Sequence, residues 1–268
     1  LRLGENHFWL ALADSDVLLW ARGVALNAGM RVTIREPDVS PVQIQGPKAR
    51  DVIGALFGDS VLQLRYYHFL ETALDRIPVV VTRTGWSGEV GYEIYLRDGS
   101  RGDELWERIM EAGRAHHIRP TGPSDIRRVE AGILNWGADM TLEDNVYEVG
   151  LDYLVDEAKP AAYIGRDALA RIKAIGVKKK LVGIEISGPR IEMNAIRCPV
   201  QHDGEPIGCV TSAVWSPRLK QNIGYAMLPL AHTAIGTTVA VALPEDGARA
   251  ATVVARPFLD PGKTIPKA

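Results

Sequence analysis

The sequence lacks three features that would place it in a specialised class of protein. It has no apolar stretch approaching the ~20 residues of a membrane-spanning helix, and no basic segment followed by an apolar one marks a secretion signal. Neither charge sign dominates, because the 268 residues carry a formal net charge of −2 at pH 7 and a pI near 6.4. These absences give no electrostatic reason for binding nucleic acid or a membrane, and we expect a cytoplasmic protein.

Cysteine is also scarce, since Cys198 and Cys209 are the only two. A two-residue turn at Asp203-Gly204 would place them opposite each other across a hairpin. In that register they form a hydrogen-bonded pair, whose wider spacing disfavours a disulfide. We therefore expect two free thiols.

The common catalytic motifs are missing as well. The stretch GWSGEVG, residues 85–91, does not have the G-x-G-x-x-G spacing of a dinucleotide site, and it precedes a strand pattern rather than a helix. The stretch PGKT at 261–264 lacks the earlier glycine of a phosphate loop, and His116-His117 lacks the spacing of a zinc motif. No G-x-S-x-G elbow is present. We expect neither a metal site nor a serine nucleophile.

The remaining composition is that of an ordinary globular protein, with 46% hydrophobic and 24% charged residues over a length that allows two domains. FWLALA (8–13) predicts a buried strand, Asp14 or Ser15 can cap a helix that Gly29 closes, and MRVTIRE (30–36) alternates like a strand. PVQIQG and PKARDVIGALFG then predict a strand and a helix. This β-α-β-β-α order favours a ferredoxin-like, split α+β arrangement.

From Lys180 onward the pattern changes to short strands separated by turn residues, without a helical period. We read this part as a separate all-β module. The predicted fold class is therefore α+β, a ferredoxin-like split α/β region at 1–178 followed by a small all-β barrel at 179–268.

Glu93 is the first candidate site residue. It lies in the predicted strand YEIYL (92–96), directly after the glycine-rich stretch, and the two-residue period of a strand puts it on the same face as Tyr95. One interpretation is an exposed strand carboxylate beside a half-buried tyrosine. The other is a carboxylate that accepts two parallel N–H bonds from the amidine-like edge of a flat ring such as a pterin, with nearby aromatic faces stacking on it.

Five segments in order carry a family resemblance. RTGWSGEVGYEIY, residues 83–95, resembles the R-T-G-[YW]-[ST]-G-E-x-G-[YF]-E-[IL] signature of the glycine cleavage T-protein family, the folate-dependent aminomethyltransferases and their demethylase relatives. The other segments similar to family motifs are VSPVQIQGPKARDVI, DIRRVEAGILNWGADM, YIGRDAL and GCVTSAVWSPRLKQNIGYAML, the last with Ala213 in place of a usual glycine. The resemblance covers about the whole chain, and it implies that 1–178 is a partial folate-binding region.

The resemblance implies roles for four residues. Glu93 would grip the pterin of tetrahydrofolate, Trp86 would lie close to the folate, and Arg128 would help to hold it. Tyr95 together with Trp86 would border the methyl donor. A helix salt bridge with Asp125 is the structural alternative for Arg128.

The chain begins at Leu1 rather than at a methionine, and ENHFWLALAD runs directly into a strand-like pattern, so we expect an N-terminal segment to be missing. In the family that this sequence resembles, the acidic residue nearest the reacting nitrogen belongs to that segment. We therefore assign no catalytic residue.

The aromatic residues favour one branch of the family. Trp86 and Tyr95, with NVYEVGL where T-proteins have T-P-x-E-A-G-L, are closer to dimethylsulfoniopropionate demethylase and the aryl-methyl-ether O-demethylases. An aromatic wall suits a sulfonium by cation–π attraction and a methoxylated ring by stacking. We predict a tetrahydrofolate-dependent demethylase that takes a methyl group from a small-molecule donor. The alternatives are a glycine cleavage aminomethyltransferase, whose partner would be a lipoyl carrier protein, and a non-catalytic folate-binding module.

Overall fold

The computed structural model describes the chain except for residues 13–16 and 245–246. The described residues form two compact units, Leu1–Gly122 with Lys263–Ala268, and Pro123–Gly262. The predicted fold class, an α+β region followed by a small all-β barrel, is confirmed. The predicted helix caps Asp14 and Ser15 lie outside the described residues.

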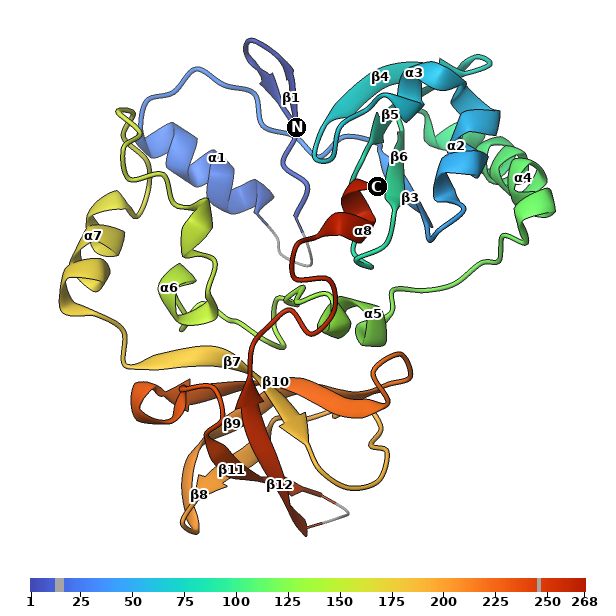
Figure 1. Ribbon diagram of the computed structural model, residues 1–268. Helices are drawn as coiled ribbons and strands as arrows, with labels where there is room; N and C mark the ends of the chain where they lie inside the picture. The colour runs from blue at the N-terminus through green and yellow to red at the C-terminus, as the bar shows by residue number, and fades with distance from the viewer. Residues whose placement is uncertain (13–16, 245–246) are drawn as a thin grey trace. The chain divides into compact units, whose positions relative to one another are not determined.

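The first unit is built on a four-stranded antiparallel sheet in the order β3-β6-β5-β4 (Figure 1). Strands β4 (Phe69–Leu74), β5 (Ile77–Thr82) and β6 (Gly91–Leu96) form a meander, and β3 (Ser40–Gln45) pairs with β6. We call the connection at residues 83–90 the β5–β6 loop. The segments PVQIQG and YEIYL thus form neighbouring strands, as their alternation predicts.

One face of this sheet carries the hydrophobic core of the unit. Helices α2 (Ala49–Phe57) and α4 (Gly102–Gly113) pack on this face, and the short helix α3 (Asp59–Leu62) follows α2 (Figure 1). Tyr92 and Ile94 of β6 point into the core and are fully buried. The next residues along the strand therefore point to the opposite face.

The N-terminal apolar run is not the buried strand predicted from FWLALA (8–13). Among the described residues of this run, 8–12, only Phe8 is in a strand, β2 (His7–Phe8), which pairs with β1 (Arg2–Gly4) in a two-stranded ribbon. Leu10 and Leu12 are exposed at 73% and 54%. The prediction is wrong because an apolar run forms a buried strand only where a neighbouring strand satisfies its backbone, and the four-stranded sheet does not extend to this segment.

The helix predicted after this run is present as α1 (Leu18–Asn27), and Gly29 follows it with a positive φ of 65°. MRVTIRE (30–36) forms no strand among the described residues, so the second predicted strand is also wrong. Alternation alone describes a two-faced segment, but a strand also needs a partner for its N–H and C=O groups.

The second unit starts with three short helices, α5 (Asp125–Glu130), α6 (Val146–Val149) and α7 (Arg166–Ile175). Helix α5 has Ser124 as its N-cap, whose hydroxyl accepts from the Arg127 N–H at 3.4 Å. This cap fixes where the helix begins.

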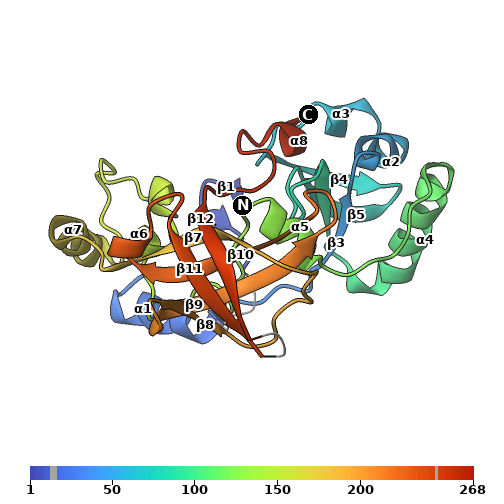
Figure 2. The same cartoon turned by 60° about the horizontal axis from the view of Figure 1, so that its bottom comes forward.

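Six antiparallel strands then close into a barrel in the order β10-β7-β12-β11-β8-β9 (Figure 2). Closure leaves no strand edge exposed and surrounds a core of aliphatic side chains such as Ile184, Val200 and Val241. The strands are β7 (Lys179–Ile186), β8 (Cys198–His202), β9 (Glu205–Ser216), β10 (Gln221–Pro229), β11 (Thr238–Leu243) and β12 (Gly247–Val254).

The β8–β9 hairpin turns at Asp203 and Gly204, both with positive φ, as the sequence predicts. A β-bulge shifts the register by one residue, so Cys198 pairs with Val210. The prediction that Cys198 lies directly opposite Cys209 is therefore wrong. Both thiols are free.

Arg83 anchors the end of the chain within the first unit. Its buried guanidinium donates to the backbone oxygens of Leu64 at 3.2 Å and Pro266 at 3.3 Å, and also to that of Ala268. These bonds hold α8 (Thr264–Lys267) beside the start of the β5–β6 loop.

Gln45, the last residue of β3, holds the β5–β6 loop. Its amide lies between Gly85 and Gly91, where an added Cβ would come within 2.1 Å of Oε1 or 2.3 Å of Nε2. The amide nitrogen donates to the Thr84 oxygen at 3.3 Å, and Oε1 accepts from the Ser87 hydroxyl at 2.6 Å. The two glycines therefore leave the space that this side chain fills, and we call the arrangement the Gln45 clamp.

We expect Gly91→Ala to displace the Gln45 amide and lower the free energy of unfolding by about 1–3 kcal/mol, because an added methyl overpacks a filled space. Urea unfolding measures this loss. Gln45→Ala removes the group that the methyl meets, so the double variant should lose less than the sum of the two single variants. Gly122→Ala is the control, since no atom lies within 4 Å of its added Cβ. Strictly additive losses would contradict the clamp.

Candidate functional site

Glu93 and Tyr95 share the face of β6 that points away from the helices, as the two-residue period predicts. Tyr92 and Ile94 are fully buried in the core, whereas Glu93 and Tyr95 are half-buried. The hydrophobic alternation of β6 thus separates residues that stabilise the unit from residues that can contact a ligand.

Side chains from both neighbouring strands surround the Glu93 carboxylate. Gln43, directly opposite on β3, donates from Nε2 to Oε1 at 2.8 Å. Thr84 in the β5–β6 loop donates from Oγ1 to Oε2. Thr82, opposite Glu93 on β5, has its hydroxyl oxygen 2.5 Å from that of Thr84. Each carboxylate oxygen therefore accepts a hydrogen bond from the protein.

The Glu93 carboxylate, as a hydrogen-bond acceptor, fits a pterin-like ring. An ionised carboxylate has about four lone-pair positions, and Gln43 and Thr84 use one on each oxygen of Glu93. The Tyr95 hydroxyl also hydrogen-bonds to this carboxylate. A ligand with two N–H groups would therefore use the remaining position and take the place of the Tyr95 bond. Two parallel N–H groups are what an amidine-like ring edge presents, and such paired, charge-assisted bonds are among the stronger polar contacts in proteins.

An aromatic surface lies next to this carboxylate. The rings of Trp9 and Tyr95 have centroids 6.3 Å apart at an interplanar angle of 51°, and the Arg97 guanidinium carbon is 5.4 Å from the Trp9 ring centroid. Burial raises the pKa of Tyr95 to about 12, with the neighbouring Glu93 carboxylate as a further cause. The Tyr95 phenol is therefore a neutral hydroxyl at physiological pH.

Trp86 lies half-buried in the β5–β6 loop. The residues on either side of it belong to the Gln45 clamp: Gly85 makes room for the amide, and Ser87 bonds to it. The backbone that carries Trp86 is therefore held from β3. Glu93, Tyr95 and Trp86 thus all belong to the first unit, on β6 and the loop that leads into it.

Arg128 belongs to the second unit, in α5, where it is completely buried. Its Nε donates to Asp125 at 2.7 Å, one terminal nitrogen donates to Asp139 at 2.6 Å, and the other donates to the Ser212 hydroxyl at 2.9 Å. The salt bridge with Asp125, the structural alternative from the sequence, is present. A role of Arg128 in holding folate stays a prediction.

Sequence reasoning missed Gln43, Thr84 and Trp9. Gln43 could have been found by pairing PVQIQG with YEIYL in antiparallel register, since it stands directly opposite Glu93. Thr84 carries no such signal, because its contact depends on how the β5–β6 loop folds back. Trp9 lies in FWLALA, for which the sequence predicts a buried strand.

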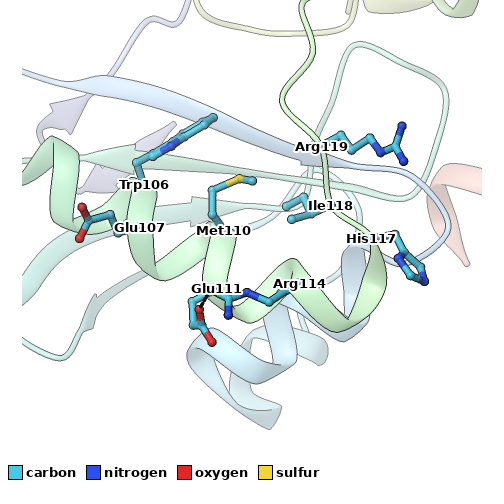
Figure 3. A pocket seen from close by; sticks show the side chains of 8 residues that line it. All are labelled: Trp106, Glu107, Met110, Glu111, Arg114, His117, Ile118 and Arg119. Atoms are coloured by element: carbon cyan, nitrogen blue, oxygen red, sulfur yellow. Dashed lines mark hydrogen bonds and ion pairs between the residues drawn. The ribbon is translucent and has the colours of Figure 1, made fainter.

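A surface hollow of about 670 Å³ on α4 and the turn after it contains none of the predicted site residues (Figure 3). The side chains that line it are Trp106, Glu107, Met110, Glu111, Arg114, His117, Ile118 and Arg119. Glu111 and Arg114 form an exposed ion pair at its edge (Figure 3). Exposed ion pairs of this kind contribute little to stability. Because the hollow contains none of the predicted site residues, Glu93 remains the centre of the candidate site.

The described part of the chain has neither a metal-binding cluster nor a membrane-spanning helix. No group of three or more His, Cys, Asp or Glu side chains could hold a metal ion there. None of the helices that the structure describes has the length and apolar character needed to cross a membrane. His116 instead has its Nδ1 3.7 Å from the Asp51 carboxylate.

Comparison with known proteins covers both parts of the chain. The family model of the GCVT N-terminal domain matches residues 1–159, and that of the glycine cleavage T-protein C-terminal barrel domain matches residues 179–260. A crystal structure of the glycine cleavage system aminomethyltransferase T from Bartonella henselae matches with a TM-score of 0.75 at 22% sequence identity. That match covers 90% of this chain and 65% of the other, and it shows a shared fold.

Curated relatives are closer in sequence. The dimethylsulfoniopropionate demethylase DmdA of Ruegeria pomeroyi is 38% identical over 253 residues, which is 94% of this chain and 68% of that protein. An aminomethyltransferase of a Synechococcus strain is 36% identical over 252 residues, 92% of this chain and 67% of that protein. The chain thus spans about two-thirds of the length of these relatives. From these matches and its fold, the chain belongs to the glycine cleavage T-protein family.

Proposed function

We propose that this chain forms the folate-binding part of a tetrahydrofolate-dependent one-carbon transferase, and that the group transferred is a methyl group from a small methylated compound. The observation that carries the proposal is the half-exposed Glu93 carboxylate, whose two oxygens are held by donors from Gln43 and Thr84 on either side of it. Membership of a family whose members include a demethylase and aminomethyltransferases supports the same class of reaction.

Residues of the first unit would have separate roles in binding the folate. Glu93 would orient the pterin by accepting from its amino group and ring N–H, and Trp86 would lie against the ring. Tetrahydrofolate, when bound, supplies the nitrogen that accepts the one-carbon group. The protein contributes alignment and exclusion of water, and well-oriented systems can gain up to ~7–11 kcal/mol from such alignment.

The aromatic side chains suggest the class of donor. Tyr95 and Trp86 would border it, and Trp9 adds a ring beside Tyr95. A sulfonium on such a surface gains on the order of 1 to 2 kcal/mol by cation–π attraction, and a methoxylated aromatic ring gains by stacking. The 38% identity to a dimethylsulfoniopropionate demethylase favours the sulfonium as the first donor to test.

Arg128 enters the proposal as a residue that helps to hold folate, as the family resemblance implies. Its guanidinium is fully buried against Asp125, Asp139 and Ser212. We therefore propose that it acts by fixing the segment around α5 rather than by touching the pterin.

A glycine cleavage aminomethyltransferase is the second candidate. Two relatives with that name are 36% and 35% identical over most of this chain, nearly as similar as the demethylase. This activity would require a lipoyl carrier protein as partner.

We expect Glu93→Gln to weaken tetrahydrofolate binding roughly 10- to 100-fold, because hydrogen bonds to a charged group contribute about 1.5–3 kcal/mol. Titration calorimetry with the purified protein measures this affinity. Glu107→Gln is the control, because it removes a carboxylate charge at an exposed position of α4. Equal affinity of Glu93→Gln and the unaltered protein would sink the folate assignment.

Turnover should separate the two candidates. With tetrahydrofolate present, we expect the protein to consume dimethylsulfoniopropionate or a methoxylated benzoate such as vanillate, with loss of the donor followed by chromatography. Turnover that instead requires a lipoyl carrier protein and releases ammonia would identify an aminomethyltransferase. Folate binding without any turnover would favour the non-catalytic module.

The pKa of the Tyr95 hydroxyl reports on its contact with Glu93. Burial is the main reason that the pKa of Tyr95 is raised to about 12, and the nearby Glu93 carboxylate adds to it by disfavouring the tyrosinate anion. Glu93→Gln removes that charge, so we expect Tyr95 to ionise at lower pH. NMR of ¹³C-labelled tyrosine follows the transition, and Tyr95→Phe identifies its signal. A pKa unaffected by Glu93→Gln would contradict the contact between the two side chains.

A further inference from the structure

We propose that Thr84 is a positioning residue that holds Glu93 as an acceptor-only carboxylate, and that this makes the site selective for rings presenting two parallel N–H donors. The inference rests on the proposed folate-binding function and deepens it. It concerns a residue of the β5–β6 loop that would act on the ligand through Glu93.

The direction of two hydrogen bonds supports this role. An ionised carboxylate only accepts, so the contact between Thr84 and Glu93 Oε2 is donated by the Thr84 hydroxyl. A hydroxyl has a single proton to donate. The 2.5 Å contact between Thr82 and Thr84 must therefore be donated by Thr82. Both protons point along the chain of oxygens toward Glu93.

The fold keeps this chain of hydroxyls in place. Thr82 is the last residue of β5, is 2% exposed and stands opposite Glu93 in the sheet register. Threonine is β-branched, which restricts its first side-chain torsion. Gln43 approaches the other carboxylate oxygen from β3 but is solvent-exposed. The half-buried Thr84 is therefore the better-fixed of the two donors.

The consequence is a polarity filter for the ligand. An ionised carboxylate accepts hydrogen bonds and has no proton to donate. A ring edge with two N–H groups can satisfy both oxygens of Glu93. A ring edge that places a carbonyl there would bring two acceptors together and leave them unpaired, and such mismatches discriminate strongly between ligands.

The role of the Thr84 hydroxyl can be separated from the shape of the loop. The Thr84 backbone oxygen accepts from Gln45, and this bond does not involve the Thr84 side chain. Replacing the side chain by valine keeps its branched shape and removes the donor. Replacing it by serine keeps the donor.

The test compares tetrahydrofolate affinity by calorimetry in folded proteins checked by circular dichroism. We expect Thr84→Val to weaken binding about 10-fold or more and Thr84→Ser to remain within about threefold of the unaltered protein. Thr72→Val, which removes a hydroxyl from β4 of the same sheet, should leave binding unchanged. Adding Thr84→Val to Glu93→Gln should cause little further loss, because Thr84 acts through Glu93.

Ligand preference distinguishes positioning from a structural effect. The unaltered protein should prefer pterin over lumazine, which has a carbonyl in place of the amino group, and Thr84→Val should reduce that ratio. An equal loss for both rings, or no loss of tetrahydrofolate affinity in Thr84→Val, would overturn the inference while the folate function stands. Failure of the unaltered protein to bind tetrahydrofolate would overturn both.

Discussion

The amide of Gln45, inserted between Gly85 and Gly91, is the contact on which the proposed site depends. It links the end of β3 to the loop that carries Trp86, and it does so only because both glycines lack a Cβ. Its two hydrogen bonds satisfy the amide and fix the backbone of Thr84. The glycine-rich stretch is therefore not a flexible phosphate-binding loop. It is a connection shaped around one side chain.

The β5–β6 loop leads into β6, and the two faces of this strand have different roles. Its buried face completes the core with Tyr92 and Ile94, and its other face presents Glu93 and Tyr95. A sheet packed on one side by helices can hold polar side chains on the other side without burying them in the core. Core packing fixes the position of the strand, and so it also fixes the carboxylate to within the freedom of its own torsions.

Local sequence patterns predict individual strands and the faces of their side chains. They do not predict which segments pair with one another. The strands of the barrel follow from short segments separated by turn residues. The shared face of Glu93 and Tyr95 follows from the two-residue period of a strand. FWLALA is a continuous apolar run and MRVTIRE alternates, and both patterns are typical of strands. Strand formation also requires a pairing partner, which neither pattern reveals. The register of Cys198 depends on a bulge, and the contact of Thr84 depends on the path of a loop, so neither is encoded in spacing.

Arg128 and Glu93 show why a shared motif does not by itself identify a ligand contact. Burying the pair of Arg128 and Asp139 costs desolvation energy, which the Ser212 and Thr211 hydroxyls and the backbone N–H of Asn135 help to offset. Removing one member would leave a buried charge unpaired, so the fold alone can require the arginine. This network needs no ligand to account for it.

The Glu93 carboxylate differs in two physical respects. It is half-exposed, and the hydrogen bonds from Gln43, Thr84 and Tyr95 leave it acceptor capacity. Donors from two sides orient this carboxylate where it is still partly exposed. Remaining hydrogen-bonding capacity combined with exposure, rather than membership of a motif, is the criterion by which we propose Glu93, and not Arg128, as the residue that touches the ring.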